Sequence, residues 1–88
     1  MSSPEHVPPD SPRRRPDLTL RERQVLIAWI LDDNKDSVAL RLHISAATVR
    51  TVVQRVRAKY AAAGRPAPTK AALVARALQD GLIKIDQL

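Results

Sequence analysis

The apolar residues of this chain recur with helical spacing, and the first such stretch follows a clear start signal. Thr19, followed three residues later by Glu22, is a capping box, which predicts the beginning of a helix. The polar cluster at residues 32–34 predicts that this helix ends near Leu31. Its apolar stripe, which should face the core, consists of Val25, Leu26, Trp29 and Ile30.

A short second helix and a tight turn are expected next. Asn34 or Asp33 can cap the second helix, which should end near His43. Its inward residues are Val38, Ala39 and Leu42. The residues that follow indicate a tight turn, with His43 as a turn residue, Ile44 buried, and Ser45 capping a third helix.

The third helix, predicted over about Ala46 to Ala61, has two unlike faces. The apolar face consists of Val49, Val52, Val53, Val56 and Tyr60. The opposite face presents Ala47, Arg50, Thr51, Gln54 and Arg57, with Arg55 and Lys59 along its flank. Valine and threonine also favour strands, but the adjacent pair Val52 and Val53 breaks the alternation that a half-buried strand needs.

A loop with two prolines, residues 64–68, separates the third helix from a fourth. Thr69 can cap this fourth helix, which should run to about Asp80 and stop at Gly81. Its apolar stripe is Leu73, Val74, Ala77 and Leu78. Its small face, Ala71, Ala72 and Ala75, suits either core packing or a dimer contact. The C-terminal apolar residues are expected to cover the core; they are Leu82, Ile83, Ile85 and Leu88.

The N-terminal end has a different composition. Five prolines fall within the first sixteen residues, among serines and few apolar side chains. We therefore expect a disordered arm over residues 1–17 and a single all-α domain over 18–88. The run Arg13-Arg14-Arg15 is either a solvated linker or an arm that reaches DNA beside the main site.

Composition excludes several classes of function. The chain has 88 residues, no Cys, and only two His, so we expect no disulfide, no metal site and no cofactor. It offers no nucleophile with a base, no carboxylate pair and no Gly-rich phosphate loop, so we do not expect an enzyme. The longest apolar run, residues 25–31, is too short to span a bilayer, and we expect a cytoplasmic protein without membrane contact.

The net charge of +6 becomes informative once it is located. No Asp or Glu lies between Asp36 and Asp80, whereas this segment carries Arg41, Arg50, Arg55, Arg57, Lys59, Arg65, Lys70 and Arg76. A segment of one sign this long indicates an anionic partner, with nucleic acid first and a membrane surface second. A solvated basic surface is the plain alternative.

A short helix, a tight turn and a helix with a basic outer face form the architecture of helix-turn-helix DNA binding. Such a helix enters the major groove and reads bases from its exposed N-terminal half. The expected base-contacting residues are Arg50 for guanine, Gln54 for adenine, Thr51 for thymine, and Ala47. The expected phosphate-contacting residues are Ser45, Thr48, Arg55 and Lys59.

The chain resembles the LuxR/GerE-type helix-turn-helix family of bacterial transcription regulators over about residues 18–85. Two ordered motifs carry the resemblance, Leu18-Thr19-x-Arg21-Glu22-Arg23-x-Val25-Leu26 and Val38-Ala39-x-x-Leu42-x-Ile44-Ser45-x-x-Thr48-Val49-Arg50. The resemblance implies a four-helix domain that binds double-stranded DNA, with the fourth helix pairing two subunits as a homodimer on inverted repeats. The family's base-contacting positions fall on Arg50, Thr51 and Gln54, and its phosphate-contacting positions on Ser45, Thr48 and Lys59.

The chain departs from the family pattern at three places. Val52 stands where many members have His, the linker between the first two helices is about one residue shorter, and the loop 61–68 is several residues longer. Most members also carry an N-terminal receiver or ligand-binding domain, so the chain resembles a stand-alone member or a piece of a longer regulator.

Two other functions fit the pattern less well. The fourth region of a sigma factor is similar in sequence, and that interpretation adds a contact with RNA polymerase, which tight promoter binding would require. A helical protein-interaction adaptor would instead use the Ala-rich fourth helix and the basic face to dock an acidic protein. The dependence of DNA binding on polymerase, salt and base sequence distinguishes these functions.

Overall fold

The computed structural model describes residues 15–32 and 34–88, and this part of the chain contains helices and no strand. The helices are α1 (Leu20–Leu31), α2 (Lys35–Leu42), α3 (Ala46–Ala62), α4 (Lys70–Gln79) and the short 3-10 helix η1 (Ile85–Gln87). The predicted all-α, four-helix fold is confirmed. The predicted arm lies outside the described residues up to position 14.

Each of the four α-helices begins at the N-cap that the sequence indicates. Thr19 and Glu22 form the full capping box of α1, in which each side chain bonds the other residue's backbone N–H. Asn34 caps α2, Ser45 caps α3 and Thr69 caps α4. These short polar side chains satisfy N–H groups that have no partner inside a helix, so the starts are fixed within one turn of sequence.

Three of the helices end in the same backbone motif. After α2, α3 and α4, the chain passes through one residue in the left-handed region, and the next N–H returns to a carbonyl five residues back. Gly64 and Gly81 occupy this position after α3 and α4, with φ of 76° and 74°. His43 occupies it after α2, with φ of 58°. His43 is therefore the turn residue that the sequence predicts, at a position that favours glycine.

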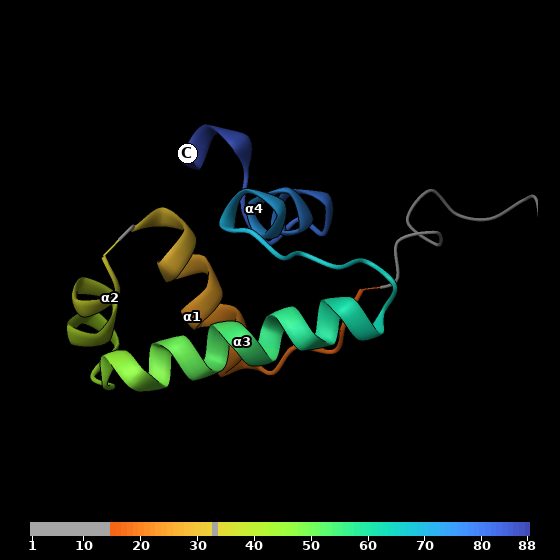
Figure 1. The fold of residues 1–88 in the computed structure, drawn as a ribbon. Helices are drawn as coiled ribbons and strands as arrows, with labels where there is room; N and C mark the ends of the chain where they lie inside the picture. The colour runs from red at the N-terminus through yellow and green to blue at the C-terminus, as the bar shows by residue number, and fades with distance from the viewer. Residues whose placement is uncertain (1–14, 33) are drawn as a thin grey trace, which may run out of the picture.

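The core lies between α3 and the other helices. In Figure 1, α3 runs along one side of the molecule, α2 lies at its N-terminal end, and α4 lies across from it, with α1 between. All five residues of the predicted apolar face of α3 are buried, and so are the four of α1, including Trp29. In α2 and α4, Val38, Ala39, Leu73 and Ala77 are buried, whereas Leu42, Val74 and Leu78 are half-buried. Ile44, expected to be buried, is half-buried.

The expectation for the C-terminal end is only partly met. Ile83 is buried and Leu82 packs against the core, as predicted. Ile85 and Leu88 are 77% and 58% exposed, so the expectation that they cover the core is wrong. The chain turns after Gly81, Ile83 takes the last core position, and η1 carries the final apolar residues outward.

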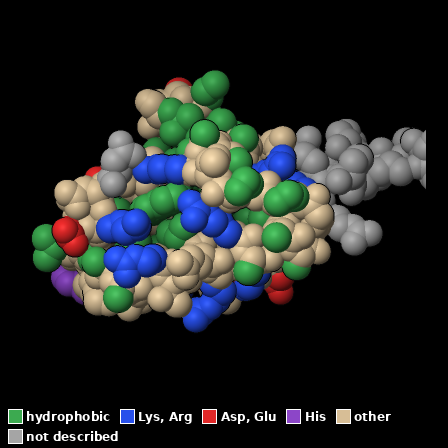
Figure 2. Space-filling view, viewed as in Figure 1, with side chains coloured by type: hydrophobic (Ala, Val, Ile, Leu, Met, Phe, Trp, Pro, Cys, Tyr) green, Lys and Arg blue, Asp and Glu red, His purple; other side chains and the backbone are tan. Residues whose placement is uncertain are grey.

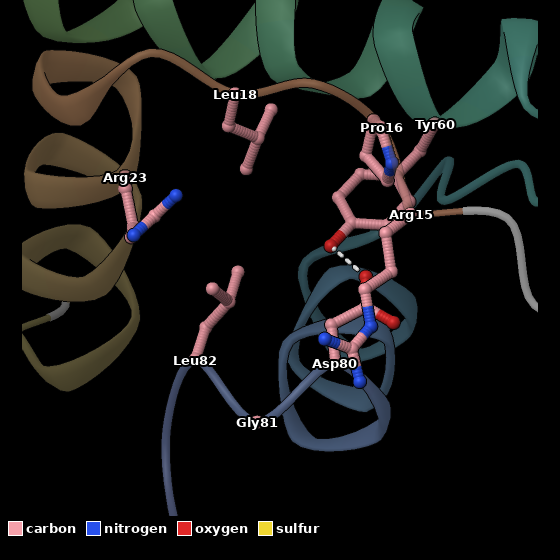
Figure 3. A pocket seen from close by; sticks show the side chains of 8 residues that line it. All are labelled: Arg15, Pro16, Leu18, Arg23, Tyr60, Asp80, Gly81 and Leu82. Atoms are coloured by element: carbon pink, nitrogen blue, oxygen red, sulfur yellow. Dashed lines mark hydrogen bonds between the residues drawn. The ribbon is translucent and has the colours of Figure 1, made fainter. Parts of the chain in front are cut away.

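A buried polar network fastens the long α3–α4 loop. The Asp80 carboxylate, at the end of α4, accepts a hydrogen bond from the Tyr60 hydroxyl at 2.7 Å (Figure 3) and two from the Arg65 guanidinium at 2.9 and 3.1 Å. Arg65 also lies over the Tyr60 ring. Burial, followed by the bond to Asp80, raises the pKa of Tyr60 above its ordinary range, so its hydroxyl remains a donor. The network joins α3, the loop and α4.

Residues 15–17, which the sequence assigns to the arm, lie beside this network. Arg15 and Pro16 line a small cavity with Arg23 of α1 and the turn after α4 (Figure 3). Pro16 is half-buried, and its carbonyl accepts the Leu18 N–H at 3.0 Å. The first described residues therefore follow the surface of the domain.

Candidate nucleic-acid interface

The turn between α2 and α3 is held from both sides. The Arg21 guanidinium of α1 donates to the Leu42 carbonyl at the end of α2, at 3.0 Å. Ser45 on the other side accepts the Thr48 N–H at 3.0 Å. Because the end of α2 and the start of α3 are both fixed, the angle between the two helices is defined by the backbone and by these bonds.

The outward face of α3 is open to solvent at each predicted base-contacting position. Ala47, Arg50, Thr51 and Gln54 are all exposed, on the side opposite the buried valines. Ala47 comes first along the helix, and the longer side chains of Arg50 and Gln54 follow one and two turns later. These four side chains lie within two turns of the helix.

The electrostatic character of this face is positive. Lys and Arg side chains are spread across the face shown in Figure 2, whereas the carboxylates in view lie at its edges. The side chains of Arg50 and Arg55 make no hydrogen bond or ion pair with any residue that the structure describes. Their guanidinium groups are exposed and available to an anion.

Ser45 and Thr48, two of the predicted phosphate-contacting residues, are bound to each other. Their hydroxyl oxygens lie 2.9 Å apart, and the Ser45 oxygen also caps the helix. Both residues are exposed, so one hydroxyl proton of the pair remains free to point toward an anion beside the start of α3.

Lys59, the fourth predicted phosphate-contacting residue, is tied into the domain. Its ammonium donates to Glu22 Oε1 at 2.6 Å and to the Asp17 carbonyl at 2.9 Å. Burial disfavours the charged form of Glu22, but bonds from Lys59 and the Thr19 backbone outweigh it and hold the pKa of Glu22 below its ordinary value. Lys59 therefore links α3 to α1 through two of its N–H groups and keeps the third for a phosphate.

The candidate dimer residues on α4 differ in exposure. Ala71 and Ala75 are exposed, whereas Ala72 is half-buried and packs against the core. Of the three alanines, Ala72 therefore contributes to core packing, and the other two face solvent. Ala71 and Ala75, one turn apart, place two small side chains on the outer side of α4.

Three contacts of the cations and of Trp29 were not predicted from the sequence. Lys59 pairs with Glu22, Arg65 is buried against Asp80, and Trp29 carries two cations on its ring. The partners in each case lie between 15 and 41 positions apart in the chain, so no local spacing signals them. A Lys or Arg in a segment without acidic residues can therefore still pair with a carboxylate from another part of the chain.

The described residues contain no helix long and apolar enough to cross a membrane. Within the same residues, no group of three or more His, Cys, Asp or Glu side chains is placed to hold a metal ion.

Comparison with known families gives one match. Residues 16–72 match the model of the family described as "GerE: Bacterial regulatory proteins, luxR family". The matched segment is well over half of the chain and includes α1, α2, α3 and the first residues of α4. Neither a curated protein nor a solved structure matches the chain.

Proposed function

Because the chain belongs to the luxR family of bacterial regulatory proteins, we propose that it binds double-stranded DNA sequence-specifically and so regulates transcription. In this proposal α3 is the recognition helix and lies in the major groove. The observation that carries the proposal is the outward face of α3, which is exposed, basic and held at a defined angle by the preceding turn. An α-helix fits the major groove, where every base pair presents a distinct pattern of donors and acceptors.

The base-reading roles follow from the side-chain chemistry. Arg50 can donate two parallel hydrogen bonds to guanine O6 and N7, and Gln54 can pair with adenine N6 and N7. Thr51 lies between them on the outward face and can contact a thymine methyl or a base acceptor. Ala47, one turn before Thr51, leaves room for the helix start to approach the base edges.

The phosphate-binding roles follow from position and charge. Ser45 and Thr48 lie at the start of α3, where unpaired backbone N–H groups also favour an anion. Arg55 is exposed on the flank of α3, where its guanidinium can contact a phosphate of the DNA backbone. Lys59 contributes through its remaining N–H while it anchors α3 to α1. Contacts of this kind position the protein without reading bases.

We further propose that two copies bind an inverted repeat through the outer side of α4. Its exposed Ala71 and Ala75 allow close approach of a second α4, and the exposed Ile85 and Leu88 lie beyond the end of the same helix. In this arrangement the protein acts in the cytoplasm, where bacterial DNA lies.

Selection from randomised duplex DNA tests the function. The purified protein is incubated with the pool at near-physiological salt, and the bound DNA is sequenced. Enrichment of an inverted repeat supports both specific binding and the dimer, and the half-site spacing gives the geometry. Enrichment of a single half-site supports specific binding and contradicts the dimer. No enrichment contradicts sequence-specific recognition, and absence of binding favours the protein-interaction adaptor.

A further inference from the structure

Two cations lie over the single tryptophan of the chain, where three helices meet. The Arg57 guanidinium carbon of α3 lies 5.7 Å from the centroid of the Trp29 ring, and the Lys70 ammonium of α4 lies 4.8 Å from it. Trp29 belongs to α1 and is only 7% exposed. The indole ring attracts each cation. Two cations are thus gathered within 6 Å of one ring.

Arg57 has no carboxylate partner among the described residues. Within the described residues, no ion pair or hydrogen bond reaches its guanidinium. Its Nε is buried without a hydrogen-bond partner, and the first turn of α4 holds no acidic residue. A half-buried cation in such surroundings is stabilised by an anion from outside the chain.

The position of Arg57 identifies that anion. Arg57 follows Arg50 and Gln54 on the outward stripe of α3, roughly 10 Å beyond Arg50 at about 1.5 Å per residue. The major groove is about 12 Å wide, so a helix whose first turns read bases brings its third and fourth turns to the sugar-phosphate backbone.

A shallow groove runs beside Gln54 and Arg57, the second of the two being a member of the cation pair. It lies between α3 and the α3–α4 loop, and its lining includes Gln54, Arg57, Ala61, Pro66 and Pro68. The lining contains no carboxylate, and its alanine and proline surfaces suit the apolar edge of a deoxyribose. The long loop thus extends the basic face of α3 toward the start of α4.

We propose that Arg57 and Lys70, stacked on Trp29, form an additional binding site for one phosphate of the DNA backbone. This inference rests on the proposed function, since it requires α3 in the major groove. Trp29 orients the two cations and does not touch the DNA itself. The site joins α1, α3 and α4 at one point of the backbone, beyond the four phosphate-contacting residues already named.

The test compares the salt dependence of DNA binding. Arg57→Gln, Lys70→Gln and the double variant are titrated against a labelled duplex by fluorescence anisotropy at several salt concentrations. Lys84→Gln is the matched control, because Lys84 is exposed and lies beyond α4. We expect the double variant to lower the salt slope by about 0.9, the value for one phosphate contact, with base preference unchanged. The control should keep the slope of the wild type.

Trp29 fluorescence gives a second readout, because it is the only Trp of the chain. Duplex DNA should change the emission of the wild type, because the bound phosphate alters the charge beside the ring, and the double variant should lose this change. Urea denaturation shows that each variant is folded before it is titrated. If the wild type binds DNA and the double variant keeps both its slope and its emission change, the inference is wrong and the proposed function stands. If the wild type shows no salt-dependent binding, both are wrong.

Discussion

His43, in the turn before α3, adopts a backbone conformation that few residues with a side chain adopt. Its φ of 58° places it in the left-handed region, where Gly64 and Gly81 serve the other two helix ends. The left-handed conformation costs a residue with a Cβ roughly 1 kcal/mol or more, whereas glycine is free of this clash. His43→Gly should therefore raise the free energy of unfolding by about 1 kcal/mol, as measured by urea denaturation with Trp29 fluorescence.

His43→Ala is the matched control, since alanine removes the imidazole but keeps the Cβ. It should leave the free energy of unfolding close to that of the wild type. If alanine stabilises the protein as much as glycine does, the imidazole itself is unfavourable and the backbone explanation is wrong.

Lys59 is bound to the buried carboxylate of Glu22, so its replacement should lower the free energy of unfolding more than it weakens DNA binding. Lys59→Met leaves Glu22 buried without its cation, and we expect a loss of about 2 kcal/mol at pH 7, less than for a fully buried pair because Lys59 is partly exposed. Arg55→Met, one turn earlier, removes an exposed charge and should change the free energy of unfolding little. Urea denaturation of both variants measures the difference.

The pH dependence of this loss has a definite sign. In the wild type the pKa of Glu22 lies below its ordinary value of 4.5, so its stabilisation is present above that value and is lost as the pH falls through the lowered pKa. In Lys59→Met the pKa of Glu22 should lie above its unfolded value, so stability is lost as the pH rises. The deficit of the variant should shrink between pH 7 and pH 4. A deficit that does not vary with pH would mean that Lys59 acts through packing alone.

Features that depend on one or two neighbouring side chains are the ones that could be predicted from the sequence. The four N-caps follow from residues within one helical turn of each helix start, so they could be predicted. The outward set Arg50, Thr51 and Gln54 follows from the periodicity of α3. The bond from Lys59 to Glu22 spans 37 positions, and only the packing of α3 on α1 brings these residues together.

A buried ion pair fastens the α3–α4 connection to the end of α4. Arg65 leaves the loop and donates twice to Asp80, while Tyr60 donates to the same carboxylate. Asp80→Asn removes the charge and leaves the buried guanidinium of Arg65 without its counter-ion. We expect a loss of about 3 kcal/mol in the free energy of unfolding.

Hydrogen exchange locates this loss within the fold. In Asp80→Asn the amides of α4 should exchange faster relative to those of α1 and α3 than they do in the wild type, because the network fastens α4 and the loop. Asp86→Asn is the control, since Asp86 is exposed in η1. Uniform acceleration across all helices would contradict a local role for the network.

Helix positions could be predicted from the periodicity of apolar residues, but the C-terminal end could not. The stripes of α1 and α3 are each buried as a whole, because a continuous stripe leaves only one way to face the core. Ile85 and Leu88 are as apolar as Ile83, yet only Ile83 finds space in the core. Which apolar residue fills the last space depends on the turn after α4 and on the helices opposite.

The positive charge on the surface of the acid-free segment comes from fewer side chains than the sequence suggests. Of the eight cations in the acid-free segment, Arg65 faces inward to Asp80 and Lys59 is bound to Glu22. The outward cations of α3 are thus mainly Arg50, Arg55 and Arg57. A net charge of +6 favours association with DNA in general, whereas the proposed function assigns base recognition to the ordered face of α3.

Comparison of the base preferences of wild type and Arg50→Ala tests the central claim most directly. Both proteins select from the same randomised duplex pool at the same salt, and the enriched sequences are aligned position by position. The wild type should prefer guanine at one position of each half-site, and Arg50→Ala should lose that preference alone, at about 1–3 kcal/mol of discrimination. An enriched sequence with the same guanine preference in both proteins, or no enriched sequence for the wild type, would contradict α3 as the recognition helix.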